Sequence, residues 1–260
     1  MALNDKALFL YGFDVTPYNR YINFKNQSLG PELLATLNLG NYTATEFIAE
    51  VKRALEAADG VYTYTITIDR TVASGQSNLL HISSSAPFFS LLFLTGSSAA
   101  NSPASIMGFQ NLDYTGATAY VSYKNCGVIL FPDFPTYDYL GPGEMVENDG
   151  SRNVSAYGVK ETLVFAQFYF FQGQWQYITN FNGNTQKTQF EAFLQYATKQ
   201  RKFEFTPSVY EDPTTFYQCT LESAAGYSSG MGYVLKQMRG QGLYRFYDTG
   251  VLKFRVNPIL

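Results

Sequence analysis

The stretch NYTATEFIAEVKRALEAADGVYTYTITIDR, residues Asn41–Arg70, predicts a helix followed directly by a strand. Thr43 and Glu46 have the spacing of a capping box, in which each side chain accepts from the backbone N–H of the other residue. Apolar residues then recur at helical spacing until Gly60, which suits a left-handed C-cap. After Gly60 the pattern alternates with period two, as in a half-buried strand. We therefore expect an amphipathic helix near 44–58 that packs on a sheet.

The rest of the chain reads as short strands and turns, with one further helix predicted near 186–199. The apolar stripe of this helix consists of Phe190, Phe193, Leu194 and Ala197. Aromatic residues make up 17% of the chain, and charged residues only 15% against a usual level of roughly 25%. This composition favours strands. The predicted fold class is α+β, mostly β, with two β-rich domains that each have one amphipathic helix packed on a sheet.

The predicted domain boundary is the segment 132–152. It contains three prolines, the sequence Gly-Pro-Gly and a polar run, a combination that interrupts strand pairing and has little to bury. The expected division is an N-terminal β-rich domain at 1–131, a connector at 132–152 and a C-terminal β-rich domain at 153–260.

Charge and hydropathy exclude several classes of protein. The net charge is −3 with no basic stripe, which argues against a nucleic-acid binder. No apolar run reaches the roughly 20 residues that a membrane-spanning helix needs. The N-terminus lacks the basic and apolar segments of a signal peptide, so we expect folding in a reducing cytoplasm. Cys126 and Cys219 are then expected as free thiols at half-buried strand positions, although a disulfide between them stays open.

No motif in the sequence predicts catalysis, a cofactor or a metal. The single histidine, His81, lies in a predicted strand with no nucleophile motif nearby. The glycine-rich stretch Gly226–Gly232 lacks the Lys-Ser/Thr ending of a phosphate-binding loop. Asp133 and Asp138 read as solvated loop carboxylates. A hydrolase that uses two carboxylates about 5–9 Å apart is a further alternative function, because such residues can come from anywhere in a sequence.

Two stretches resemble proteins of tailed-bacteriophage virions. Within Leu29–Tyr120 the sequences GPEL, LGNYTATEF, VKRALEAADGVYTYTITIDRT, FFSLLFLTG and DYTGATAY follow one another as in such virion proteins. Within Ala156–Tyr217 the sequences AYGVKETL, QFEAFLQYA, KFEFTP and DPTTFY are similar to the β-rich domain of tail proteins of the distal-tail or baseplate-hub kind. Together the two stretches cover about two-thirds of the chain.

The resemblance implies a non-enzymatic structural protein at the tail or at the tail-fibre/baseplate junction. Such a protein would form a homo-oligomeric ring and contact other tail proteins, without a cofactor. The second domain would form the ring and the first would hold a neighbouring component. The expected location is the virion tail, assembled in the host bacterial cytoplasm. A capsid decoration protein or a head-to-tail connector is a variant of the same hypothesis.

A different class of function is a carbohydrate-binding module for host surface glycans. Its candidate contact residues are four aromatic residues in or near predicted loops: Tyr137, Tyr139, Trp175 and Tyr227. The same residues could equally lie in an interface between subunits or in a core.

Overall fold

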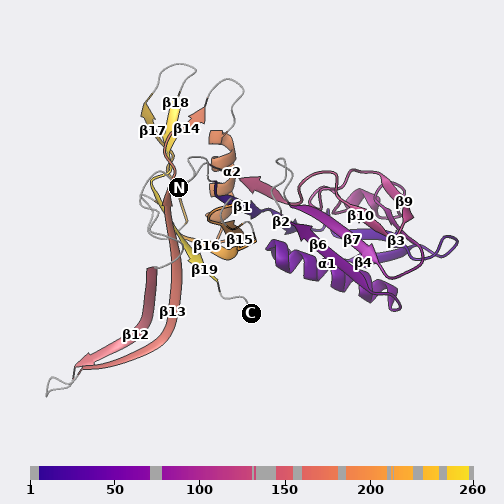
Figure 1. Cartoon of the computed structure of the whole chain (residues 1–260), viewed down its shortest axis with the longest axis horizontal. Coiled ribbons are helices and arrows are strands. Elements are labelled where there is room, and N and C mark those ends of the chain that lie inside the picture. Colours follow the sequence, from indigo (N-terminus) through magenta and orange to yellow (C-terminus); the bar gives the residue numbers. More distant parts are fainter. Residues whose placement is uncertain are drawn as a thin grey trace.

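The computed structural model describes residues 6–70, 78–130, 132, 145–154, 160–180, 186–209, 212, 214–224, 231–239 and 245–257. These residues form mostly antiparallel strands, together with two α-helices and one 3-10 turn, which confirms the predicted class. Two lobes are visible in Figure 1. The N-terminal lobe comprises residues 12–127, and the C-terminal lobe comprises residues 6–11 and the described residues from 128 onward.

Helix α1 (Ala44–Asp59) has both predicted caps. Thr43 Oγ1 accepts from Glu46 N at 3.3 Å, and Glu46 Oε2 accepts from Thr43 N at 2.9 Å. At the other end Gly60 has a φ of 71° and donates its N–H to the carbonyl of Glu56 at 2.9 Å. The φ explains the glycine, since side chains with a Cβ rarely adopt this conformation.

The N-terminal lobe contains three sheets. The four-stranded sheet has the order β4 (Leu33–Thr36), β3 (Tyr21–Lys25), β8 (Phe89–Leu92) and β9 (Asp113–Ala117). The three-stranded sheet has the order β10 (Ala119–Val121), β7 (Leu79–Ser84) and β6 (Tyr64–Asp69). A two-stranded sheet pairs β2 (Phe13–Val15) with β5 (Gly40–Tyr42). The 3-10 turn η1 (Ala99–Asn101) follows β8.

Helix α1 lies against the outer strands of the two larger sheets. The sheets are joined on one side by the consecutive strands β9 and β10, and α1 contacts β4 and β6 on the other. Arg53 Nη2 donates to the carbonyl of Thr36 in β4 at 3.1 Å, and Glu56 Oε1 accepts from Tyr64 N in β6 at 3.2 Å. The helix therefore satisfies one backbone group on each outer strand, where unpaired N–H and C=O groups would invite pairing with another chain.

The C-terminal lobe is built on a seven-stranded sheet. Its order is β11 (Val128–Leu130), β1 (Leu8–Tyr11), β15 (Phe203–Thr206), β16 (Tyr217–Ala224), β19 (Val251–Val256), β13 (Lys160–Gln174) and β12 (Met145–Val154). A three-stranded sheet has the order β14 (Ile178–Asn180), β18 (Arg245–Asp248) and β17 (Lys236–Arg239). Helix α2 (Gln186–Ala197) buries all four residues of its predicted stripe.

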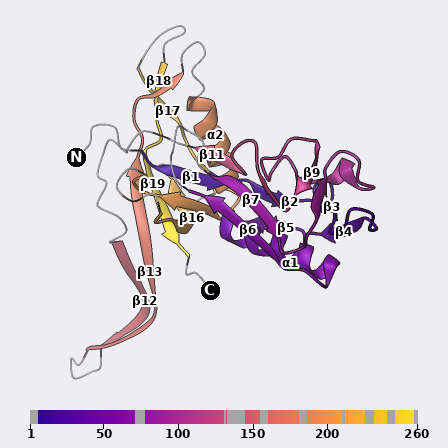
Figure 2. The ribbon, with the colours of Figure 1, turned by 45° about the vertical axis from the view of Figure 1, so that its right-hand side comes forward.

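Strand β1 belongs to both lobes. It pairs with β11 and β15 of the C-terminal sheet, and Figure 2 shows it leading directly into β2 of the N-terminal lobe. Phe9 and Tyr11 face the C-terminal core, whereas Leu10 faces the N-terminal core. A strand with opposite faces in two cores is buried on both sides, and all four residues of β1 are buried.

The predicted domain boundaries are wrong at two places. Strands β1 and β11 fall within the predicted domain 1–131, yet both belong to the C-terminal sheet. Residues 145–152 of the predicted connector lie in strand β12. The cause is long-range pairing: Leu8 pairs with Thr206, and local composition carries no signal of such a partner.

Both cysteines are free, as predicted, but their predicted half-burial is wrong. Cys126 lies in a loop before β11 and Cys219 in β16, and neither side chain is exposed to solvent. Burial raises the pKa of the Cys126 thiol to about 12 and also raises that of Cys219. Both are therefore thiols rather than reactive thiolates at neutral pH. His81 lies in β7, in the predicted strand.

Candidate functional site

The described part of the chain contains no group of three or more His, Cys, Asp or Glu residues placed to hold a metal ion. None of the helices described is long and apolar enough to cross a membrane. Two other features distinguish the molecule, namely a projecting pair of strands and a surface pocket.

The first feature is a long β-hairpin, here called the arm, formed by β12 and by β13 up to Tyr169. Met145 pairs with Phe170 at its base, and Val154 pairs with Lys160 at the far end of the described strands. Only residues 170–174 of β13 pair with β19, so the arm lies almost entirely beyond the sheet. At about 3.3 Å per residue, the ten residues of β12 span roughly 33 Å. Figure 1 shows the arm extending away from both lobes.

The arm contains a β-bulge. Asp149 pairs with Ala166, but the next residue, Gly150, pairs with Val164, so Phe165 is an extra residue on β13. Bulges increase local twist and bend the strand pair. The curved course of the arm in Figure 1 fits this irregularity.

Strand β12 pairs with no described strand other than β13. Two strands alone in water are at best marginally stable, because one layer of two strands cannot bury a core. The arm therefore has the geometry of an element that is completed by contact with another polypeptide.

The arm projects from a body whose lobes are joined by a buried carboxylate. Glu204 in β15 is 1% exposed. Its Oε1 accepts from Thr45 N at 2.9 Å and from Thr45 Oγ1 at 3.0 Å, at the N-terminus of α1. Its Oε2 lies 2.7 Å from Arg70 Nη2, an ion pair without the angle of a directed hydrogen bond. Arg70 also stacks on Phe216, with Cζ 3.9 Å from the ring centroid.

Further polar contacts surround Glu204, and together they form the seam between the lobes. Gln218 Nε2 donates to Thr43 Oγ1 at 3.1 Å, and Lys202 Nζ lies 2.7 Å from Glu46 Oε1. The other contacts across the seam are the ion pair Arg201–Asp14 and a hydrogen bond between Asn41 and Tyr196. Because Lys202, β15 and β16 together hold the N-terminus of α1, the lobes are fixed relative to each other.

The ionisable groups of the seam make the folded state less stable at acid pH. Burial acts to raise the pKa of Glu46, but hydrogen bonds from Lys202 and Thr43 outweigh it and hold this pKa below its usual value of 4.5. A lowered folded-state pKa stabilises the fold above the unfolded pKa, and the contribution disappears as the pH falls through the folded value. We expect the melting temperature to fall below about pH 4.5, and Glu46→Gln to reduce that fall while lowering stability at pH 7. This account is contradicted if the melting temperatures of the two proteins fall by the same amount between pH 7 and pH 3.

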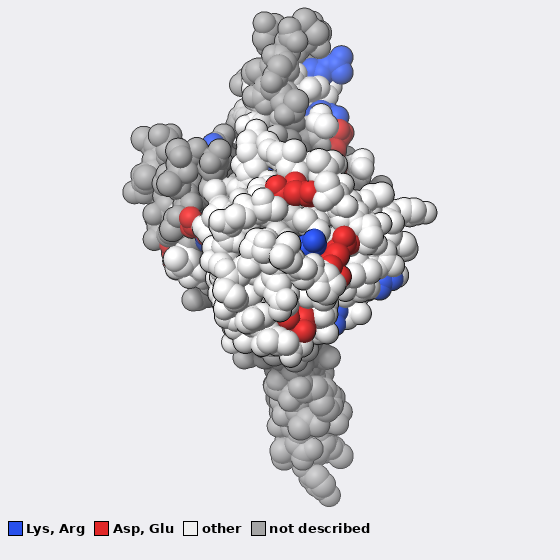
Figure 3. Space-filling model, turned by 90° about the vertical axis from the view of Figure 1, so that its right-hand side faces the viewer, with Lys and Arg blue, Asp and Glu red and all other residues white. Residues whose placement is uncertain are grey.

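The free end of the N-terminal lobe carries few charges. Figure 3 views the molecule from this side, where acidic and basic residues form only small separate patches. Large apolar side chains are exposed on this lobe, among them Tyr18, Leu29, Leu94 and Leu112. Depletion of charge together with exposed apolar side chains is typical of surfaces that bind other proteins.

Trp175 is the one predicted contact residue that lies in the described part of the chain. It is only 3% exposed and packs against Phe9, Phe190 and Phe254. Its proposed role as an exposed platform for a glycan is therefore wrong, and it is a core residue. Tyr137, Tyr139 and Tyr227 lie outside the described residues, as do Asp133, Asp138 and most of the glycine-rich stretch.

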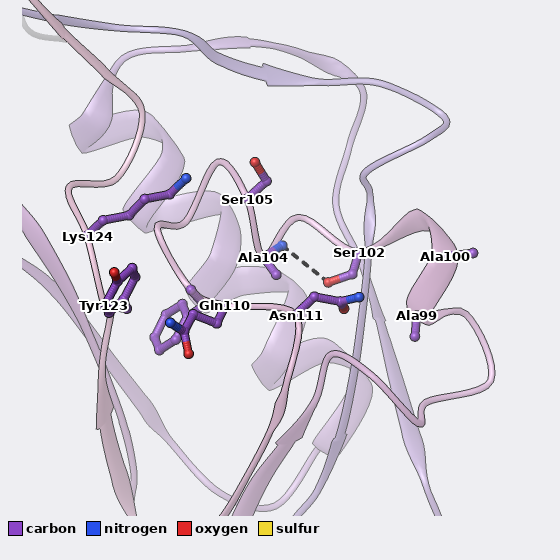
Figure 4. Close-up of a pocket in the computed structure, with 10 residues that line it drawn as sticks. Ala99, Ala100, Ser102, Ala104, Ser105, Gln110, Asn111, Tyr123 and Lys124 are labelled. Carbon is purple, nitrogen blue, oxygen red and sulfur yellow. Dashed lines mark hydrogen bonds between the residues drawn. The ribbon is translucent and has the colours of Figure 1, made fainter.

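The second feature is an open pocket of about 480 Å³ in the N-terminal lobe. One wall comes from η1 and the loop that follows it, and the other from the segment after β10 (Figure 4). The lining residues are Ala99, Ala100, Ser102, Ala104, Ser105, Phe109, Gln110, Asn111, Tyr123 and Lys124. The sequence analysis missed this pocket, because its walls come from a loop and a strand end without any motif.

Comparison with known proteins does not extend the resemblance found in the sequence. No model of a protein family matches the chain, and no curated protein sequence matches it either.

Proposed function

We propose that this chain is a non-enzymatic structural protein of a tailed-bacteriophage virion. In this proposal it forms part of the tail or of the tail-fibre/baseplate junction and assembles with copies of itself and with other tail proteins. The resemblance of the two sequence stretches supports the virion assignment. The arm is the observation that carries the assembly role, because within it β12 and β13 pair with no other described strand.

The arm also supports a ring-like assembly. It is a projecting element on a body whose lobes are fixed by the seam, so the arm of one copy would contact a different surface on the next copy. Such head-to-tail contacts produce a closed ring when the rotation between copies closes on itself. The charge-poor end of the N-terminal lobe provides a second surface for a neighbouring tail protein (Figure 3).

Removing the arm tests this proposal without disturbing the body. Met145 and Phe170 are directly paired, so residues 146–169 can be replaced by Asn-Gly, which favours a two-residue hairpin turn. We expect the whole chain, of 29.2 kDa, to form particles of several copies in light scattering, alone or with a neighbouring tail protein. The variant without the arm should keep its circular dichroism spectrum and remain a monomer under both conditions.

A shorter deletion provides the matched control. Asn148 pairs with Gln167, so linking these two residues by the same turn removes the outer arm and keeps its base. Association of this variant should be weaker than that of the whole chain and stronger than that of the variant without the arm. The proposal fails if the whole chain stays a monomer with every candidate tail protein, or if removal of the arm leaves the mass unchanged.

A capsid decoration protein or a head-to-tail connector would use the arm in the same way. The partner distinguishes these roles. Association that depends on the arm and occurs with a head or portal protein, but with no tail protein, would move the chain from the tail to the head.

A further inference from the structure

The pocket in the N-terminal lobe has fixed walls. Gly108 has a φ of 78°, and a Cβ built there would lie 2.2 Å from the carbonyl oxygen of Lys124. Lys124 N in turn donates to the carbonyl of Gly108 at 3.1 Å. The loop after η1 and the segment after β10 therefore touch through their backbones, at a distance that only glycine allows.

The floor of the pocket is also rigid. Phe109 is 3% exposed, and its ring centroid lies 5.5 Å from that of Phe93 and 5.1 Å from that of Tyr114. The Tyr114 hydroxyl accepts from Gln110 N at 3.1 Å, which holds the rim of the pocket to the same aromatic cluster. A pocket with a packed floor and a fixed rim is already formed before a ligand binds. Binding therefore costs little conformational entropy of the protein.

The rim carries polar groups that have no partner among the residues described. The side chains of Gln110, Asn111 and Lys124 make no hydrogen bond or ion pair with another described residue, and neither does the hydroxyl of Tyr123. In Figure 4, Gln110 lies between Tyr123 and Asn111, and Lys124 extends towards the side of Ser105. Tyr123 is 64% exposed, so its ring is accessible to a ligand.

This lining excludes several classes of ligand. No residue in it is acidic, so it lacks the carboxylates that a calcium or magnesium ion requires. It holds one basic residue and no helix N-terminus of regular length, which is too little for a polyphosphate. Its apolar atoms come mainly from alanines and the edge of one buried ring, which do not form the deep apolar cavity that a lipid or drug-like ligand fills.

A sugar ring satisfies the remaining requirements. Its hydroxyl groups both donate and accept hydrogen bonds, as do the carboxamides of Gln110 and Asn111 and the serine hydroxyls. One face of a sugar ring carries C–H groups that pack on an aromatic ring such as Tyr123, whose body is apolar and whose tip is polar. The volume of about 480 Å³ is within the roughly 300–1,000 Å³ of small-molecule sites.

We propose that this pocket binds a saccharide, with Tyr123 against one ring face, Gln110 and Asn111 on the ring hydroxyls, and Lys124 beside a carboxylate where the sugar has one. This binding is additional to the structural role and does not depend on it. It also differs from the carbohydrate-binding alternative of the sequence, because it uses none of the four aromatic residues named there.

Titration of the whole chain with saccharides tests the proposal. The probes are glucose, N-acetylglucosamine and glucuronic acid, observed by saturation-transfer NMR and calorimetry, with inorganic phosphate as a non-sugar anion. We expect millimolar binding of at least one sugar. Asn111→Ala and Tyr123→Ala should each weaken it about five- to tenfold, the effect of losing roughly one directed contact. Lys124→Gln should weaken binding of glucuronic acid alone.

Tyr18→Ala is the matched control, because Tyr18 is 80% exposed in the same lobe and does not line the pocket. It should leave every affinity unchanged. The altered side chains are exposed, so unchanged melting curves would establish that all variants are folded. The proposal is overturned if no sugar binds at millimolar concentration, if phosphate alone binds, or if the pocket variants bind as the whole chain does. Because light scattering does not enter this test, its failure would leave the assembly role untouched.

Discussion

Replacing Glu204 with alanine is expected to lower the free energy of unfolding by about 3–5 kcal/mol, the cost of breaking a buried ion pair from one side. Arg70 would lose the carboxylate that lies 2.7 Å from its guanidinium. Thr45 would lose the acceptor for its backbone N–H and its hydroxyl at the N-terminus of α1, where a negative charge is favourable. The measurement is urea denaturation at pH 7, followed by circular dichroism.

Two variants separate this effect from simple loss of a charge. Glu191→Ala removes the partner of Lys187 from a partly exposed pair on α2, and should cost no more than about 0.5 kcal/mol. Glu204→Gln keeps an oxygen that can accept from Thr45, so its cost should lie between the two alanine variants. If Glu204→Ala costs no more than Glu191→Ala, the seam does not hold the lobes together in the way inferred from its geometry.

Phe9→Ala is expected to be about as damaging, with a loss of about 3–5 kcal/mol for deletion of a fully buried aromatic side chain. The Phe9 ring is completely inaccessible to solvent. It lies between 4.5 and 5.9 Å, centroid to centroid, from five other rings: Trp175, Phe193, Phe203, Phe205 and Phe254. These rings come from four segments of the C-terminal lobe, so the cavity would open at the centre of that core and could collapse only in part.

Leu10→Ala is the informative companion, because Leu10 is the neighbouring residue of β1 and faces the N-terminal core. Leu10→Ala should lower the free energy of unfolding by about 2–5 kcal/mol. Since β1 is shared, both variants should shift one common unfolding transition in denaturant. Two separate transitions, with Phe9→Ala affecting one and Leu10→Ala the other, would show that the lobes unfold independently.

The sequence predicts best what is encoded locally. The capping box of Thr43 and Glu46, the apolar stripe of α1 and the left-handed Gly60 are all interactions within a few residues, and each is present in the structure. The apolar stripe of α2 was predicted for the same reason and is buried. In these segments the period of the apolar residues alone determines which side is buried.

The sequence predicts less well what depends on distant partners. The apolar sequence of β1 does not identify the strands that pair with it, so β1 was assigned to the wrong domain. Trp175 was named as a possible contact residue with a core position left open, and the rings that cover it come from β1, α2 and β19. The pocket depends on the contact between Gly108 and Lys124, which no local pattern predicts.

The position of β1 has a consequence for the order of folding during synthesis. β1 leaves the ribosome well before its partner β15, which ends at Thr206, and before β19 of the same sheet, which ends at Val256. The N-terminal lobe can close around α1 early and β1 can pair with β11, but Phe9 and Tyr11 lack their C-terminal core partners until α2, β15 and β19 have been made. Sheets that join distant segments of a chain form slowly, because a long loop must close before any contact is gained. We therefore expect the nascent chain to display the apolar side chains of β1 until β15 emerges, and to bind chaperones that recognise extended apolar segments.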